Sequence, residues 1–206
     1  MTAGDARSLT KPEGRSICLF CGSSDAADPA FLEAASALGT AMAVAGVRLV
    51  YGGGGIGLMG AAARAAHEAG GKVLGIMPAF LGSREVLFDA VETVVTANMH
   101  DRKQIMFEQS DAFVVAPGGI GTLEEVVELI SWRRLDLHAK PIVFLNPRNF
   151  WAPFFALIDH TIAENLTPAW TTDAWGVADR VEDVLPLVEQ LMASSRAHDG
   201  EVSAKS

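Results

Sequence analysis

The chain has 206 residues, of which half are hydrophobic and a fifth are charged. This composition is typical of one folded domain, because disordered chains have fewer apolar residues and domains usually have about 100–200 residues. The formal net charge is −9, from 16 Lys and Arg against 25 Asp and Glu. An acidic chain of this kind argues against binding to nucleic acid, but a small phosphorylated ligand stays compatible with it.

No apolar run approaches the roughly 18 residues that a membrane-spanning helix needs. The first 15 residues, MTAGDARSLTKPEGR, contain no apolar segment of the kind found in secretory signals. We therefore expect no membrane association and a cytoplasmic location.

Apolar and amphipathic segments alternate along the chain and predict strands and helices in turn. Strands are expected at residues 16–21, 47–51, 72–77, 91–96, 111–116 and 141–145, with a last short strand around Val177. Helices are expected at residues 29–45, 58–69, 99–110, 122–134, 150–164 and 181–194. Residues 1–14 and 196–206 are polar and aperiodic, so we expect flexible tails around a single domain at residues 15–195.

The predicted strands are apolar almost throughout, as in Phe113-Val114-Val115-Ala116. Such strands lie in sheets that are buried on both faces, and their alternation with helices predicts an α/β fold. We expect a Rossmann-like, doubly wound parallel sheet with helices on both faces. Its ligands should bind at the carboxyl ends of the strands, where the sequence places residues 21–25, 52–57, 78–85, 97–103 and 117–125.

The two cysteines, Cys18 and Cys21, have the C-x-x-C spacing of some redox pairs. They fall in a predicted strand, where residues three apart point to opposite faces, so we interpret them as buried thiols. The five histidines are scattered, and His67-Glu68 lacks a second histidine four residues later. We therefore expect no metal site.

A glycine-rich turn at residues 51–60 contains G-x-G-x-x-G between a predicted strand and a helix. Dinucleotide sites also carry an acidic residue about 20 residues later, and the next predicted strand ends without one. The successive glycines, which include Gly53 and Gly54, favour close approach of the backbone to a phosphate-like ligand other than NAD. A tightly packed strand-to-helix turn is the alternative.

A second glycine turn, Pro117-Gly118-Gly119-Ile120-Gly121-Thr122, follows the most apolar strand and opens a helix. Free backbone N–H groups and the helix dipole favour an anion there. No Lys-Ser or Lys-Thr pair follows these glycines, so the turn is not a triphosphate-binding loop. A single phosphate, held by the amides of Gly118 to Thr122 and the Thr122 hydroxyl, fits the pattern better.

Thr122 and Glu125 also have the spacing of a capping box, which would imply no chemistry. Against this interpretation, Glu124, Glu125 and Glu128 crowd the helix that follows the expected anion site. Carboxylates near a phosphate are unfavourable unless they face another part of the ligand. The residues alone leave the choice between a cap and a catalytic group open.

Arg102 and Lys103 begin a predicted helix at the same edge of the sheet. Adjacent helical residues diverge by about 100°, so the two cations cannot face one point. We expect one to reach the ligand and the other a neighbouring segment or a partner chain. A solvated charged turn is the alternative.

Together these motifs resemble the Lonely Guy (LOG) family of cytokinin-activating phosphoribohydrolases, whose members are often labelled lysine decarboxylases. The resemblance covers residues 16–145. The matching stretches are Cys21-Gly22-Ser23-Ser24, Tyr51-Gly52-Gly53-Gly54 with Gly57-Leu58-Met59-Gly60, Arg84-Glu85, Met99-His100 with Arg102-Lys103, Gln109-Ser110-Asp111-Ala112-Phe113, and Pro117-Gly118-Gly119 with Gly121-Thr122-Leu123-Glu124-Glu125.

The resemblance implies hydrolysis of the N-glycosidic bond of a nucleoside 5′-monophosphate, either N6-prenylated AMP or AMP itself. The products would be the free base and ribose 5-phosphate, and no cofactor is implied. The family often has Thr at the position of Ser131 and a larger or aromatic residue at that of Ile120. The residues expected to bind substrate are Ser23, Gly53, Gly54, Glu85, Lys103, Gly118, Gly119, Ile120, Gly121, Thr122, Leu123, Glu124 and Ser131.

Glycoside hydrolysis builds positive charge on the sugar and needs an activated water. We expect Glu125 to serve both needs, with Glu85 or Glu124 on the ribose hydroxyls. A guanidinium is a poor proton donor, so Arg102 is expected to act electrostatically.

A non-catalytic nucleotide or cofactor carrier on the same fold is the alternative function. A pyridoxal-dependent decarboxylase would need a Schiff-base lysine, for which Lys103 is the plausible candidate. The resemblance also implies a homodimer, often with a site completed across the interface. Apolar residues Ile105, Met106, Phe107 and Trp132 could form that surface or pack in the core.

Overall fold

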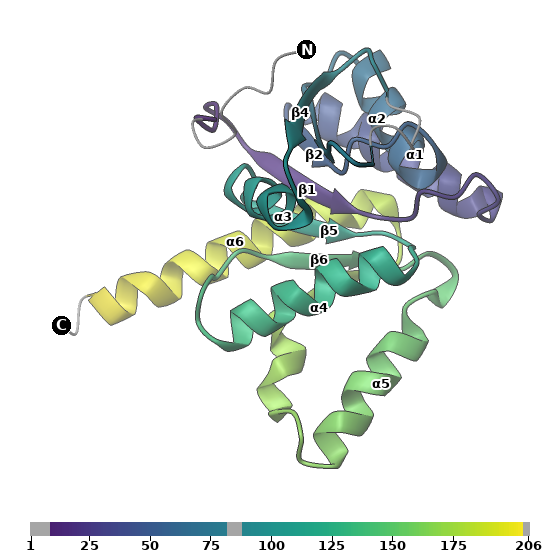
Figure 1. Ribbon diagram of the computed structural model, residues 1–206. Coiled ribbons are helices and arrows are strands. Elements are labelled where there is room, and N and C mark those ends of the chain that lie inside the picture. The colour runs from purple at the N-terminus through teal and green to yellow at the C-terminus, as the bar shows by residue number, and fades with distance from the viewer. Residues whose placement is uncertain (1–8, 82–87, 204–206) are drawn as a thin grey trace.

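The computed structural model describes residues 9–81 and 88–203, and its strands form one parallel sheet between two layers of helices (Figure 1). The strand order is β4-β3-β2-β1-β5-β6-β7, and every neighbouring pair is parallel. The strands are β1 (Ser16–Phe20), β2 (Arg48–Tyr51), β3 (Val73–Pro78), β4 (Glu92–Thr96), β5 (Ala112–Val115), β6 (Ile142–Leu145) and β7 (Gly176–Ala178). This confirms the predicted α/β fold.

The helices pack on both faces of this sheet. Among the described residues they are α1 (Pro29–Val44), α2 (Gly57–Glu68), α3 (Met99–Glu108), α4 (Ile120–Arg134), α5 (Ala152–Ala163) and α6 (Val181–Ser203), with the short 3-10 helices η2 (Pro147–Asn149) and η3 (Ala169–Ala174). Side chains of α1, α2 and α6 share one buried cluster with one face of the sheet. Those of α3, α4 and α5 share the cluster on the opposite face, so the sheet is doubly wound as expected.

Burial explains the apolar strands. Every residue of β1, β2, β3, β5 and β6 is buried, whereas the edge strand β4 is partly exposed. Cys18 and Cys21 lie in the clusters on opposite faces, and both are free, buried thiols. Burial raises the pKa of both thiols, which confirms their interpretation as apolar core residues.

The strand order places a crevice at the carboxyl end of the sheet. The chain leaves β1 toward β2 on one side, while β5 lies on its other side, which makes the β1–β5 junction a topological switch point. The loops after these two strands touch, because Gly22 N donates to the Pro117 carbonyl at 3.0 Å. Met59 N, on α2, also donates to the Gly22 carbonyl at 3.2 Å. Both glycine-rich turns therefore meet the loop that contains Ser23.

Two element boundaries differ clearly from the predictions. Helix α4 begins at Ile120 instead of residue 122, and α6 continues to Ser203 instead of ending near residue 194. No proline follows Pro186, so the chain after it has no strong helix breaker. The short helices η2 and η3 had no periodic signal. The flexible tails and the domain limits at residues 15 and 195 stay predictions.

In the described part of the chain, no helix has the length and apolar character required to cross a bilayer. Across the same residues, no group of three or more His, Cys, Asp or Glu side chains is arranged to hold a metal ion.

Candidate active site

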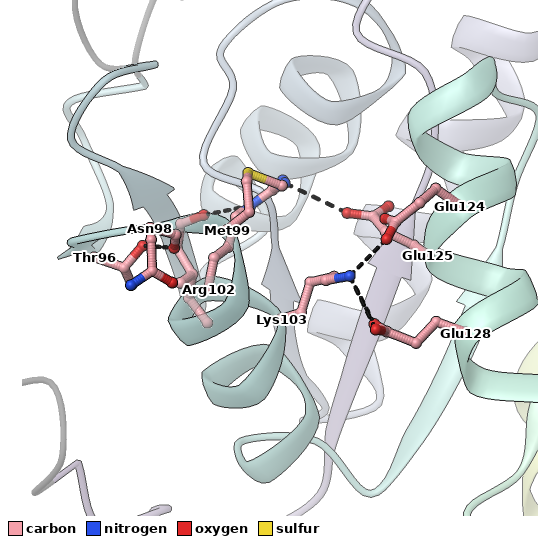
Figure 2. A network of polar contacts seen from close by, with 9 residues as sticks. Thr96, Asn98, Met99, Arg102, Lys103, Glu124, Glu125 and Glu128 are labelled. Carbon is pink, nitrogen blue, oxygen red and sulfur yellow. Dashed lines mark hydrogen bonds and ion pairs between the residues drawn. The ribbon is translucent and has the colours of Figure 1, made fainter. Parts of the chain in front are cut away.

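A buried ion pair between α3 and α4 lies at the centre of the site. Arg102 Nη1 is 3.5 Å from Glu125 Oε1, and the two side chains are only 8% and 6% exposed. Figure 2 shows the two side chains reaching toward each other across the gap between their helices. Because a buried charge is costly without a partner, the Arg102 guanidinium favours the ionised form of Glu125.

The environment of Glu125 brings its titration into the neutral range. Burial raises the pKa of this carboxyl to about 7, an effect that Arg102 and Lys103 oppose and that Glu124 and Glu128 reinforce. A carboxyl with this pKa exchanges protons readily near pH 7, which is the property of an effective general base. Perturbed groups of this kind concentrate at functional sites.

The start of α3 is built to hold Arg102 in place. The Asn98 side chain caps the helix by accepting from Asp101 N at 2.9 Å, and Thr96 Oγ1 donates to the Asn98 carbonyl at 3.1 Å. One turn into the helix, Arg102 Nε donates to the Ile76 carbonyl on β3 at 3.1 Å. The guanidinium is thus fixed to the carboxyl edge of the sheet.

Lys103 contacts α4 at carboxylates other than Glu125. Its Nζ donates to Glu124 Oε1 at 2.5 Å and to a Glu128 oxygen at 3.0 Å (Figure 2). Burial works against its charge, but these hydrogen bonds and charges raise the pKa of Lys103 above its ordinary value. The predicted divergence of Arg102 and Lys103 is confirmed, and both cations reach α4 at separate carboxylates.

Backbone amides at the start of α4 form a candidate anion cradle. The helix begins at Ile120 after Gly119, and Leu123 N donates to the Gly119 carbonyl at 3.0 Å. The N–H groups of Ile120, Gly121 and Thr122 precede that bond and have no acceptor within the helix. They therefore point out of the helix end, with its positive dipole.

The capping-box interpretation is wrong, because Gly119 occupies the N-cap position and makes no side-chain cap bond. Thr122 lies in the first turn, and its side chain lies over Gly118, where an added Cβ would be 2.1 Å from Thr122 Oγ1. At Gly119 and Gly121, by contrast, an added Cβ would meet no atom of the described protein within 4 Å. These two glycines leave open space beside the amides.

The other predicted substrate residues are spread over the same edge. Ser23 is half-buried beside α2, Gly53 and Gly54 are buried at the end of β2, and Ser131 is exposed two to three turns along α4. Glu85 lies outside the described residues. One broad hollow of about 500 Å³ follows α4 and is lined by Ile120, Leu123, Glu124, Val127, Glu128, Ser131 and Trp132.

The first glycine turn is held largely by contacts within the protein. Gly57 N donates to Asp25 Oδ1 at 2.7 Å, so a carboxylate of the chain already bonds the start of α2. Gly57 has a φ of 59° and lies against the backbone of Ser23 and Ser24. Ligand contacts at this turn stay a prediction, and no local pattern indicates Asp25, because it lies 32 positions before Gly57.

One contact of the site was not predicted, and one choice that the sequence left open is decided by burial. Glu128 binds Lys103, which its position one turn after Glu124 could have indicated. Ile105 and Met106 are buried, and Phe107 and Trp132 pack against the same cluster. These four residues therefore belong to the core instead of an exposed surface.

Comparisons with known proteins place the chain among proteins of one family. Residues 59–188, more than half of the chain, match the family model described as "Possible lysine decarboxylase". The chain is 40% identical over 181 residues to the probable cytokinin riboside 5′-monophosphate phosphoribohydrolase LOGL9 of Oryza sativa subsp. japonica, covering 84% of this chain and 80% of that protein. It is 42% identical over 156 residues to the cytokinin riboside 5′-monophosphate phosphoribohydrolase LOG7 of Arabidopsis thaliana, covering 75% and 72%.

Solved structures with the same fold include two proteins of a different description. The molybdenum cofactor binding protein of Rippkaea orientalis has a TM-score of 0.66 and 26% identity, over 88% of this chain and 99% of that one. The molybdenum cofactor carrier protein of Chlamydomonas reinhardtii has a TM-score of 0.66 and 27% identity, over 87% and 98%. The higher identities to the phosphoribohydrolases, and the extent of those alignments, show that the chain belongs to the Lonely Guy (LOG) family.

Proposed function

We propose that this chain hydrolyses the N-glycosidic bond of a nucleoside 5′-monophosphate, N6-prenylated AMP or AMP, to the free base and ribose 5-phosphate. The observation that carries the proposal is the buried Arg102–Glu125 pair, which follows an open amide cradle on the same helix. The names of the relatives, cytokinin riboside 5′-monophosphate phosphoribohydrolases, support the substrate class.

The 5′-phosphate would bind the amides of Ile120, Gly121 and Thr122, where the helix dipole favours an anion. Glu125 follows Ile120 by five positions, which is roughly 7 Å along a helix axis. A ribose 5-phosphate has comparable dimensions between its phosphate and its anomeric carbon. A nucleotide anchored at the cradle can therefore bring C1′ to the carboxylate.

In the proposed reaction, the Glu125 carboxylate accepts a proton from a water molecule as its oxygen attacks C1′. The C1′–N bond breaks, and its electron pair leaves with the base, which takes up a proton from solvent, while Glu125 returns the proton that it accepted to solvent. Positive charge that develops on the sugar is stabilised by the same carboxylate. Arg102 favours the ionised form of Glu125, and its positive charge stabilises the electrons that move onto the base.

Lys103 and the acidic pair around it would bind the rest of the sugar. Glu124 is about half exposed at the edge of the site and is held by Lys103, so its free oxygen can accept from a ribose hydroxyl. Glu85 remains a second candidate for this contact. Neutralisation by Lys103 also limits the repulsion between these acids and the phosphate.

We also propose that the protein is a homodimer whose contact lies along α4. Ile120 is 84% exposed and Val127 is 50% exposed, and both line the broad hollow beside Glu124. An apolar surface of this kind next to a site is typical of an interface. Light scattering should give twice the chain mass, and a Val127→Glu variant should reduce it to the chain mass.

A carrier function is the second candidate, because the two molybdenum cofactor proteins share the fold at 26–27% identity. A carrier would need the amide cradle but not a carboxyl of raised pKa beside it. A decarboxylase acting through a Schiff base at Lys103 is disfavoured, because two carboxylates hold this lysine as an ammonium.

Incubation of the purified protein with AMP and, separately, with isopentenyladenosine monophosphate tests the proposal. Chromatography should detect free adenine or isopentenyladenine together with ribose 5-phosphate in equal amounts. The Glu125→Gln variant should bind the nucleotide and release almost no base. Binding without release of base by the unmodified protein would favour the carrier.

A further inference from the structure

The first glycine of the turn after β2, Gly52, has no backbone reason to be glycine. Among the described glycines, those with positive φ are Gly14, Gly46, Gly53, Gly57 and Gly70. Gly52 is not one of them, so the backbone conformation at this position is open to any residue. A steric reason for glycine at this position therefore has to come from the atoms beside it.

The neighbour of Gly52 is the guanidinium of Arg102. A Cβ added at Gly52 would be 2.2 Å from Arg102 Nη2, 3.4 Å from Arg102 Cζ and 3.3 Å from Met59 Sδ. The first distance is about 1 Å shorter than an ordinary contact between such atoms. The space that an alanine methyl group would need is thus occupied by Nη2.

The other two nitrogens of the guanidinium are also engaged. Nε donates to the Ile76 carbonyl at 3.1 Å, and Nη1 lies 3.5 Å from Glu125 Oε1. A guanidinium is planar and rigid, so its three nitrogens move together. Pressure on Nη2 from a methyl group at Gly52 must therefore displace Nη1 from Glu125 or break the bond to Ile76.

We propose that Gly52 is a positioning residue that seats the Arg102 guanidinium against Glu125. The inference rests on the proposed function, since it assigns a catalytic consequence to Gly52 through Arg102. Under this proposal, Gly52 of the first glycine turn positions Arg102 and makes no contact with the nucleotide. The amides proposed to bind the phosphate belong to α4, and Gly52 has no atom of α4 among the nearest neighbours of its added Cβ.

Gly52→Ala should therefore lower kcat about 100-fold, because a displacement of about 1 Å at a catalytic group has an effect of this size. KM for AMP should change less than about twofold, since the amides at Ile120 to Thr122 stay in place. A general disturbance of the crevice would instead raise KM as well. Gly22→Ala is the matched control, because its Cβ would make only ordinary contacts of 3.5 Å with Gly118 and Pro117.

A double-mutant cycle with Arg102→Lys provides the decisive test. A lysine at position 102 has no atom equivalent to Nη2, so Gly52→Ala should add no further loss of kcat in that background. The melting temperature should follow the same pattern: Gly52→Ala lowers it with Arg102 present and leaves it unchanged with lysine. Equal losses in both backgrounds, or an unchanged kcat in Gly52→Ala alone, would overturn the proposal.

The melting temperatures separate this inference from the proposed function. They require no turnover, so they report the contact between Gly52 and Arg102 even if neither nucleotide is hydrolysed. Coupled melting temperatures without hydrolysis would retain Gly52 as the seat of Arg102 and refute the nucleotide reaction. Hydrolysis with uncoupled melting temperatures and uncoupled rates would retain the nucleotide reaction and refute the role of Gly52 in positioning Arg102.

Discussion

Replacing Glu125 by glutamine should stabilise the protein above neutral pH while it abolishes turnover. Glutamine has the shape of the protonated acid and carries no charge. In the folded chain the pKa of Glu125 is about 7, compared with 4.5 for an unperturbed group, and burial is the largest cause. The folded state therefore holds this proton over a pH range in which the unfolded state has lost it.

The sign of the effect follows from this difference. A pKa that is raised by folding contributes stability that is fully present below pH 4.5 and is lost as the pH rises through about 7. A difference of about 2.5 pKa units corresponds to about 3 kcal/mol, at 1.36 kcal/mol for each unit. Wild type and Glu125→Gln should thus be similar in stability at pH 4.5, and the variant should be about 3 kcal/mol more stable at pH 8.

Urea unfolding of both proteins at intervals of half a pH unit from 4.5 to 8.5 measures this difference. The other titrating groups are common to both chains, so their contributions cancel in the comparison. The difference in unfolding free energy should grow between pH 4.5 and 7 and then level off. A constant difference over this range, or one that grows toward acid pH, would refute the account of Glu125.

Three further predictions concern the same site. Arg102→Met removes the cation that lowers the pKa of Glu125, so the acid limb of the kcat/KM profile should move to higher pH; an unmoved limb would mean that another group controls it. Lys103→Met should move that limb in the same direction, since Lys103 also lowers the pKa of Glu125. This variant should also bind the nucleotide more weakly, as measured by calorimetry, because Glu124 and Glu128 lose their partner. Gly121→Ala should leave stability unchanged or raise it by about 0.5–1 kcal/mol, because its Cβ meets no protein atom. The same substitution should raise Kd for AMP about tenfold, which is the equivalent of one charge-assisted hydrogen bond. An unchanged affinity would show that the phosphate does not bind at the start of α4.

The fold could be predicted from local pattern because burial acts on each strand separately. Strands such as β5, with all four residues buried, require apolar side chains on both faces. The doubly wound order then follows from the alternation with helices. The start of α4 could not be predicted in this way, because Thr-x-x-Glu is also the pattern of a cap. The N-cap at Gly119 and the packing of Thr122 over Gly118 distinguish the two arrangements.

The two glycine turns show the limit of motif reasoning more sharply. Both follow a buried strand and open a helix, so both predict an anion site. In the folded chain, α2 has the Asp25 carboxylate bonded to Gly57 N, whereas Gly119 and Gly121 at α4 border open space. Asp25 precedes Gly57 by 32 positions, beyond the reach of any local pattern. The difference between a filled and an open helix end is therefore a tertiary property.

The choice between Glu124 and Glu125 depends on the same kind of information. The two acids are adjacent in sequence, but neighbouring helical side chains diverge by about 100°. Glu125 turns inward and is 6% exposed beside Arg102, while Glu124 turns outward and is 52% exposed beside Lys103. Burial raises the pKa of Glu125 to about 7. A general base near neutral pH needs that burial, so the direction in which α4 faces the sheet makes Glu125 the stronger candidate base.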